Sequence, residues 1–219
     1  MGLFPEWLPW LHKPAATREA TAMIVASGVA AGALIGFAEA GAQGPRIDRP
    51  ARDSMQRRAM EQRVRAGAAD GRPDSLEKAL ELSLRFRSPA LPAGTFVFVL
   101  SDFLSPLSPE TLHAAVATGW DVIPVIVQDP VWERSFPNVS GVTVPLSDPR
   151  DGALALVRLS RSETRDRRQA HELRAATLGT ALHELGLDTV VLTSSAPDSI
   201  YSAFVRWAEH RDSPRRGRR

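Results

Sequence analysis

The sequence predicts an α/β fold with a doubly wound, mainly parallel sheet that is covered by helices on both faces. Helical and strand patterns alternate along the chain, their connections are short, and the clearest strands are apolar on both faces. Composition agrees with a folded domain, because 43% of the 219 residues are hydrophobic and 24% are charged. The sequence contains no cysteine, which excludes disulfides, thiolate nucleophiles and cysteine-bound metal centres.

The basic character of the chain comes from its last nine residues. Residues 211–219 carry a net charge of +4, whereas the whole chain carries +2, so residues 1–210 together carry −2. We therefore expect a disordered basic tail over residues 211–219. Before it we expect a folded domain over residues 15–210, preceded by a separate segment over residues 1–14 that is rich in tryptophan and proline. Because the basic charge is confined to a tail, we expect no specific nucleic-acid partner.

One uncharged segment is long enough to suggest a membrane span. Residues 20–38 carry no charge, and three glycines in this segment have the four-residue spacing of closely packed membrane helices. However, only six of these residues strongly favour lipid. We therefore predict a helix over residues 17–31 that ends at Gly32, followed by a buried strand over residues 33–38. Membrane anchoring through residues 20–38 is the alternative.

The next part of the chain is expected to hold one loop and two helices. Prolines at both ends of residues 45–50 predict a loop. An arginine-rich pattern predicts a mostly exposed helix over residues 54–66. Asp74 and Glu77 have the spacing of a capping box, and an apolar face continues that helix to about residue 87.

Two buried strands and their connecting helix follow. Residues 95–101 form the clearest strand, and because both of its faces are apolar we place it near the centre of the sheet. Ser108 and Pro109 are typical of a helix start, and this helix runs to Gly119. The later elements are a strand over residues 121–127, a hairpin over residues 142–146 and 153–159, a helix over residues 163–185, a strand over residues 188–193 and a helix over residues 198–210.

Three of the expected strands are followed by an aspartate, namely Asp102, Asp129 and Asp148. Ligands of such sheets bind beyond the carboxyl ends of the strands, and carboxylate oxygens suit a hard cation such as Mg²⁺. Asp102 is the strongest candidate because it follows the strand that we place near the centre, although a capping role explains it equally well. Asp129 and Asp148 each precede a proline, which favours a role in turns.

Signatures of common enzyme sites are absent from the sequence. It contains no Walker A motif, no GxGxxG, no HExxH and no GxSxG elbow. His171 and His183 are each followed by a glutamate on the predicted long helix. We expect both of these pairs to be solvated and to lie at the surface.

Several motifs occur in an order that is more informative than any one of them. The chain contains Ser101-Asp102-Phe103 at a strand end, then Asp129-Pro130-Val131-Trp132-Glu133, then Phe136-Pro137, Gly141 and Asp148. Over roughly residues 15–210, this order resembles the bacterial von Willebrand factor A-like family of unknown function that is associated with MoxR-type AAA+ ATPases.

The resemblance implies a von Willebrand A fold with a metal-ion-dependent adhesion site. Asp102 corresponds to the family's aspartate after the fourth strand. Asp74, with Ser75 beside it, stands where the family has a threonine. The Asp-x-Ser-x-Ser part of this site does not occur in the sequence. We therefore expect the sheet to lack its first central strand, which would precede residue 1, and Mg²⁺ to bind weakly or not at all.

The resemblance also implies a function. It implies a non-enzymatic, cytoplasmic protein-interaction module that works with a MoxR-type AAA+ ATPase in the maturation or assembly of protein complexes. One alternative is a membrane-anchored interaction protein that uses residues 20–38. The other is a metal-dependent hydrolase that uses the strand-end aspartates.

Overall fold

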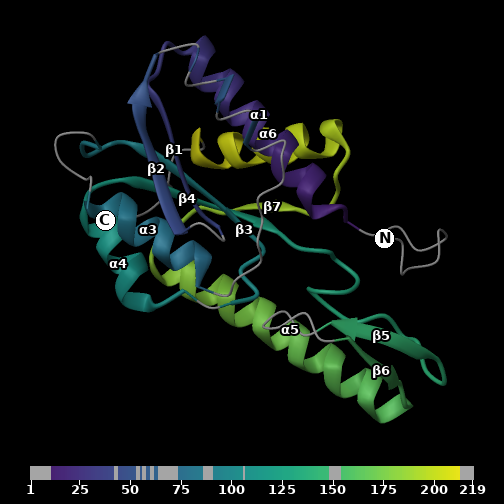
Figure 1. Cartoon of the computed structure of the whole chain (residues 1–219). Coiled ribbons are helices and arrows are strands. Elements are labelled where there is room, and N and C mark those ends of the chain that lie inside the picture. The colour runs from purple at the N-terminus through teal and green to yellow at the C-terminus, as the bar shows by residue number, and fades with distance from the viewer. Residues whose placement is uncertain are drawn as a thin grey trace.

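The computed structural model shows a mixed α/β chain (Figure 1) and describes residues 11–41, 44–52, 55, 58–59, 62–63, 74–85, 91–105, 107–147 and 154–212. Its elements, in chain order, are α1 (Lys13–Ala30), β1 (Ile35–Gly41), β2 (Gly44–Ala51), α3 (Ser75–Arg85), β3 (Phe96–Ser101), α4 (Pro109–Ala117), β4 (Asp121–Val127), β5 (Thr143–Ser147), β6 (Leu154–Arg158), α5 (Arg161–Glu184), β7 (Val190–Leu192) and α6 (Pro197–Asp212). The expected segments 1–14 and 211–219 lie largely outside the described residues.

A three-stranded parallel sheet forms the centre of the structure. Its strand order is β3-β4-β7, with Phe96 opposite Asp121 at one end of the first pair and Val127 opposite Leu192 at the end of the second. The side chains of β4 are buried from Val122 to Val127. This two-sided burial explains why the strand is an unbroken apolar run rather than an alternating one.

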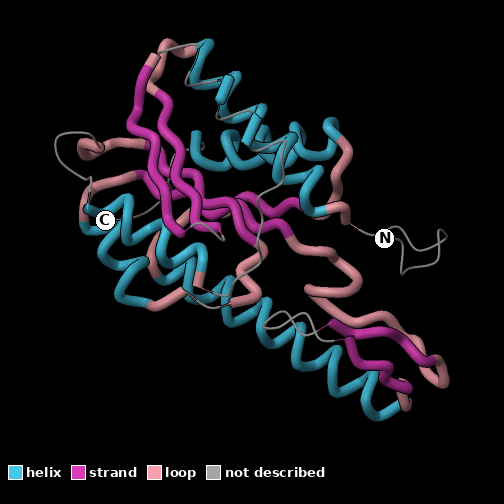
Figure 2. Tube along the Cα trace, in the orientation of Figure 1, coloured by secondary structure: helices cyan, strands magenta, loops and turns pink. Residues whose placement is uncertain are grey.

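Helices cover both faces of this sheet (Figure 2). On one face, α1 and α6 pack over Ile123, Val125 and Val127. On the other face, residues of α3, α4 and α5 pack over Val122 and Ile126. The two sets alternate along β4, as the two-residue repeat of a strand requires. The predicted parallel strands with helices on both sides are therefore confirmed.

The predicted central position of the strand over residues 96–101 is wrong for the described sheet. Strand β3 lies at its edge, and β4 is the middle strand. Both faces of β3 are apolar because helical residues pack on each of them, including Leu80 on one face and Phe204 on the other. An apolar pattern reports how the faces of a strand are covered, and it carries no information on whether a second strand flanks it.

The predicted loop over residues 45–50 is also wrong, because these residues belong to β2. Strands β1 and β2 pair antiparallel as a separate two-stranded sheet, with Pro45 opposite Ala40. Proline is tolerated in an edge strand, where its missing N–H group need not complete a ladder. Gly36 permits the close approach of the two strands, since a Cβ at this position would lie 2.9 Å from the carbonyl oxygen of Asp48.

The uncharged run over residues 20–38 is divided between α1 and β1, as the helix-strand interpretation predicts, but the predicted burial of the strand is wrong: β1 is partly exposed and pairs only with the antiparallel β2 in the described part of the chain. Gly32 follows α1 with a φ of 68°, which suits a glycine after a helix end. Within the described ranges, no helix combines the length and the apolar character that a bilayer crossing requires. In the predicted helix over residues 54–66, the described residues, which are 55, 58–59 and 62–63, are helical.

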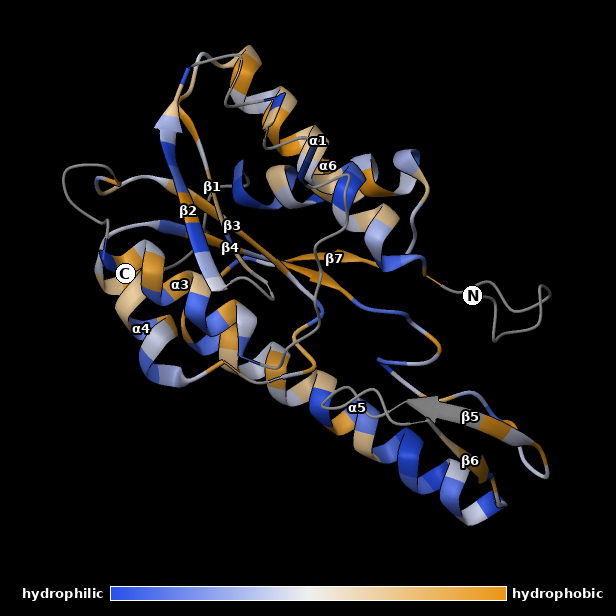
Figure 3. Cartoon of the chain, in the orientation of Figure 1, coloured by the Kyte–Doolittle hydropathy of each residue, from blue (hydrophilic) through white to orange (hydrophobic). Residues whose placement is uncertain are grey.

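The predicted hairpin after β4 is confirmed, and it forms an arm with part of the longest helix. Strands β5 and β6 pair antiparallel from Thr143 opposite Arg158 to Ser147 opposite Leu154. The hairpin and the first half of α5 project together from the sheet (Figure 1). The projecting half of α5 is largely hydrophilic, whereas β4 and β7 are hydrophobic (Figure 3). The second half of α5 therefore provides the packing against the core.

Replacement of Leu182 by alanine tests this division of α5. Leu182 is fully buried in the cluster that joins α5 to the sheet, whereas Leu173 of the same helix is 67% exposed. We expect Leu182→Ala to lower the free energy of unfolding by about 2–5 kcal/mol, and Leu173→Ala to change it by less than about 0.5 kcal/mol. Urea denaturation measures both, and equal losses would contradict the assigned packing.

Candidate functional site

Asp102 lies at the carboxyl end of β3, where the sequence places a ligand-binding edge. Its Oδ2 atom accepts a hydrogen bond of 2.8 Å from the Nζ of Lys13, the first residue of α1. Its Oδ1 atom accepts a hydrogen bond of 3.2 Å from the backbone N–H of Leu104. The side chain of Asp102 is 37% exposed. One side of this carboxylate is therefore bound to the fold, and the other side is open to solvent.

Lys13 joins Asp102 to a second carboxylate. The same ammonium forms an ion pair with Glu133, which follows β4 and has a side chain that is only 17% exposed. Burial lowers the pKa of Lys13, but hydrogen bonds and charge attraction from Asp102 and Glu133 outweigh it and raise the pKa overall. The ammonium is thus the resident cation of this site, and it neutralises carboxylates that come from two strand ends.

Asp129 is buried beside this group and has a structural role. Its Oδ1 atom accepts hydrogen bonds of 2.8 Å from the backbone N–H groups of Val131 and Trp132, which forms the turn predicted for an aspartate before proline. Its Oδ2 atom accepts a hydrogen bond of 2.6 Å from the backbone N–H of Leu11. Asp129 therefore anchors the chain two residues before Lys13 and places the ammonium at the strand ends.

The backbone at Asp102 is held in an unusual conformation. Phe103 is buried and has a φ of 50°, a left-handed value that a bulky residue seldom adopts. Its backbone N–H donates to the hydroxyl oxygen of Ser101 at 3.1 Å. The side-chain amide of Gln128, which is buried, donates to the carbonyl oxygen of Asp102 at 2.6 Å. Strain of this kind persists only where surrounding contacts hold it, and it is concentrated at functional sites.

Asp74, the second predicted metal ligand, lies at the start of α3. It forms an ion pair with Lys78 of its own helix, and it lines a pocket of about 250 Å³ beside the β1–β2 turn. The groups around Lys13 come from α1, β3 and the turn after β4, so Asp74 is not one of the carboxylates that bind this ammonium. Asp148 lies outside the described residues.

Glu77, which the sequence pattern assigns to a capping box with Asp74, connects α3 to the next helix. Its carboxylate accepts a hydrogen bond of 3.1 Å from the hydroxyl of Thr111 in α4. Hydrogen bonds from Ser108 and Thr111 lower the pKa of Glu77. Glu77 therefore links α3 to α4, in addition to its place in the predicted capping box.

The carboxylate oxygens around Asp102 only partly suit a metal ion. Within the parts of the chain that the structure describes, no three histidine or acidic side chains are grouped to hold an ion. Mg²⁺ takes one or two carboxylates and keeps several waters, so Asp102 and Glu133 have suitable chemistry. However, the Lys13 ammonium already binds both of them. A divalent ion would need oxygen ligands from outside this group, and it would have to compete with the ammonium.

The prediction of a solvated surface pair holds for Glu172, which is exposed, but is wrong for His171, which is half-buried against the segment after β4. The Nδ1 atom of His171 lies 3.0 Å from the carbonyl oxygen of Trp132 and 2.9 Å from that of Ser135. The carboxylate of Glu172 accepts a hydrogen bond of 2.8 Å from the hydroxyl of Ser135. The predicted position of His171 on a helix is right, but its partners lie more than thirty residues away in sequence.

Two arginines of α5 hold the same segment. Arg174 donates to the carbonyl oxygen of Glu133 at 2.6 Å, and Arg168 donates to that of Phe136 at 2.9 Å. Helix α5 thereby fixes the backbone that carries Glu133. The arginine-rich composition of this helix is the only signal in the sequence for these contacts, and it names no partner.

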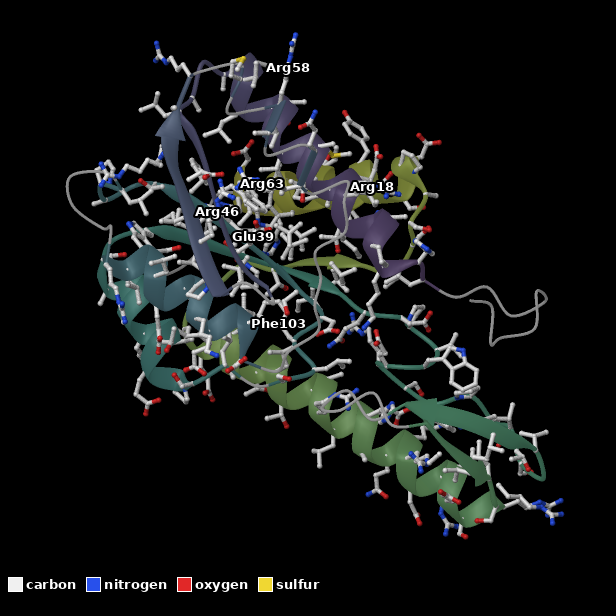
Figure 4. The ribbon with its side chains drawn as sticks, in the orientation of Figure 1. Arg18, Glu39, Arg46, Arg58, Arg63 and Phe103 are labelled. Carbon is white, nitrogen blue, oxygen red and sulfur yellow. The ribbon has the colours of Figure 1, made fainter. Side chains whose placement is uncertain are left out.

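A second group of charges lies at the β1–β2 hairpin. Glu39 stands opposite Arg46 in the β1–β2 ladder, and Figure 4 labels these two residues and Arg63 above Phe103. Both arginines pair with Asp48, and the guanidinium of Arg63 lies 5.9 Å from the ring centre of Phe37. These contacts stabilise the hairpin, and they leave the strand-end group around Lys13 as the candidate site.

Comparison with protein families gives a match over most of the chain. The model of the family described as "Protein of unknown function DUF58" matches residues 11–177, which is more than half of the chain. No curated protein and no solved structure gives a significant match.

Replacement of Lys13 by methionine tests the ammonium bridge. Methionine keeps the apolar stem but leaves two carboxylates without their shared cation. We expect a loss of about 1–2 kcal/mol in the free energy of unfolding, between the values for exposed and buried ion pairs. Lys78→Met, which removes a more exposed pair with Asp74, should cost about 0.2–1 kcal/mol. Equal losses in urea denaturation would contradict a special role for Lys13.

His171 should make the stability depend on pH. Burial and the nearby Arg174 charge lower the pKa of His171 in the folded state. The unfolded chain therefore binds the proton first, and stability is lost as the pH falls below about 6.5. His171→Gln should reduce this loss between about pH 7 and pH 5. His113→Gln is the control, because the ring of His113 is exposed and contacts its own helix at Pro109. An unchanged pH dependence in His171→Gln would contradict the assignment.

Proposed function

This chain belongs to the DUF58 family of proteins of unknown function. From the geometry of its sheet, we propose that it is a non-enzymatic protein-interaction module of the von Willebrand A type, with a doubly wound sheet. The arrangement of the strands supports this classification. They form a β1–β2 pair and a β3-β4-β7 sheet, and in the described part no strand lies on the outer edge of β3. This division is expected for a von Willebrand A sheet that lacks its first central strand.

The observation that carries the proposal is the convergence of Asp102 and Glu133 on one cation at the carboxyl edge of the sheet. The exposed side of the Asp102 carboxylate can bind a group from another molecule, because its other contacts hold it in place. The bound ammonium already shows that this position favours positive charge. A partner would dock here with a basic side chain, or with an oxygen ligand that shares a cation with Asp102.

Mg²⁺ is the divalent cation that we propose for this docking. Asp102 would hold it, and the partner would supply further oxygen ligands. Asp74, the second candidate from the sequence, pairs with Lys78 outside the group around Lys13. Lys13 would then move away from Asp102 while it keeps its contact with Glu133. Docking with the ion and docking with a basic side chain therefore differ in a measurable property, which is their dependence on Mg²⁺.

The proposed partner is a MoxR-type AAA+ ATPase, and the proposed role is the maturation or assembly of protein complexes in the cytoplasm. The support for this partner is the order of the motifs around Asp102, Asp129 and Glu133 in the sequence. Membrane anchoring through residues 20–38 would leave the same docking edge available. An interaction role is favoured over metal-dependent hydrolysis, because Asp129 uses both of its carboxylate oxygens to bind backbone N–H groups.

Binding to a MoxR-type ATPase from the same organism tests the proposal. We expect Asp102→Ala to weaken the affinity by about tenfold or more, as for a residue at the centre of an interface. Chelation of Mg²⁺ with EDTA should weaken binding of the wild-type chain by a similar factor. Biolayer interferometry with the purified full-length proteins measures both effects.

The matched control is Asp166→Ala, which removes an exposed carboxylate of α5. Its affinity should equal that of the wild type. Titration calorimetry with Mg²⁺ in the presence of the ATPase gives a second comparison, in which the wild type should release or absorb more heat than Asp102→Ala. The proposal is wrong if both aspartate variants bind the ATPase equally well with and without EDTA.

A further inference from the structure

A recess lies at the amino ends of the parallel strands. A pocket of about 490 Å³ is lined by residues that precede or begin β7, including Asp188 and Thr189, and by the last turns of α5 and α6. Since β3, β4 and β7 are parallel, the amino ends of these strands lie at the opposite end of the sheet from Asp102, which follows the carboxyl end of β3. The volume lies in the usual range for pockets that bind ligands.

The outer edge of β7 borders this pocket. Strand β7 pairs with β4 on one side, and within the residues described here no strand pairs with its other side. Val190 and Val191 of β7 line the pocket between α5 and α6. An edge strand with an open side is a site where an extended segment of another chain can pair through its backbone.

Gly179 leaves space beside this edge. It lies inside α5, where glycine is less favourable than alanine, and it lines the pocket. A Cβ atom built on Gly179 would meet no heavy atom within 4 Å. Packing against a neighbouring element therefore does not require glycine at this position. Its effect is to keep the wall of the pocket open.

Two hydrogen-bond donors in the wall of the pocket, the guanidinium of Arg206 and the indole N–H of Trp207, suit an acidic ligand. Arg206, His183 and His210 line it. The indole N–H of Trp207, which also lines the pocket, is buried and has no hydrogen-bond acceptor in the described structure. Among the described residues of the lining, Asp188 is the acidic one; its charge acts on the neighbouring Arg211, which also donates to both carboxylate oxygens of Asp121.

We propose that an extended acidic segment of a partner protein binds in this pocket as an additional strand on the outer edge of β7. Its backbone would pair with residues 189–191, its apolar side chains would fill the space beside Gly179 and Ala203, and an acidic side chain would bind Arg206. The chain's own residues 213–219 carry four arginines and would be repelled by Arg206. This inference rests on the proposed role as an interaction module, but it uses a different edge of the sheet.

The test uses a fluorescein-labelled decapeptide of alternating glutamate and valine and the full-length chain. Fluorescence anisotropy should show binding with a Kd below about 1 mM. A matching peptide of lysine and valine should not bind. In ¹H–¹⁵N spectra, the largest shifts on addition of the acidic peptide should fall on the amides of Thr189, Val190 and Val191.

Two variants test the pocket itself. Arg206→Glu reverses the charge of its wall, and Gly179→Leu fills its open space. Each should weaken peptide binding by about tenfold. Arg165→Glu, which makes the same charge change on the distant exposed part of α5, should leave binding unchanged. Gly179→Ala should raise the melting temperature, because alanine is more favourable than glycine inside a helix. This result separates the effect of residue 179 on the stability of α5 from its effect on peptide binding.

Several results would overturn the inference. One is the absence of binding by the acidic peptide, and another is binding with shifts confined to other parts of the chain. A third is equal weakening by Arg206→Glu and Arg165→Glu. A peptide-independent dimer that Arg206→Glu dissociates would assign the edge to a second copy instead. None of these results affects ATPase binding through Asp102, so the two proposals fail independently.

Discussion

Strand β4 is buried on both faces along nearly its whole length, and the rest of the structure is arranged around this constraint. A strand that is apolar on both sides needs a helical layer above and below it. Helices α1 and α6 supply one layer and α3, α4 and α5 supply the other. Because both layers are occupied, a ligand can reach the sheet only at its two ends or along an open strand edge.

The burial of β4 also shapes the candidate site, because the polar residues that follow it are buried too. Gln128 and Asp129 are at most 5% exposed, and buried polar groups need hydrogen-bond partners. Gln128 finds one in the carbonyl group of Asp102, and Asp129 finds one in the N–H group of Leu11. These two contacts hold the start of α1 and the end of β3 together, which is why Lys13 meets Asp102.

The two ends of the sheet present different side chains. At the carboxyl end, Asp102 and Glu133 surround an ammonium, and the exposed part of the site is acidic. At the amino end, Arg206, two histidines and Asp188 line the recess beside β7. In the proposed interaction module, the two ends of the sheet would bind two different partners without competition between them. Helix α5 contributes to both, because it holds the backbone of Glu133 and carries Gly179.

The sequence alone determined the elements that depend on local pattern. The apolar runs predicted β3 and β4, Gly32 and Gly119 marked helix ends, and Asp129 before proline predicted a turn. These features follow from contacts between residues close in the chain, so a short window of sequence contains the cause.

Only the tertiary structure decided which strands are neighbours and which charges pair. It placed β3 at an edge of the parallel sheet and included the prolines of β2 in a paired strand. It gave Lys13 a partner 89 residues away and turned His171 inward against Ser135. The physical reason is that periodicity along one segment records how much of each face is covered. The identity of the covering group is set by packing between segments far apart in the chain.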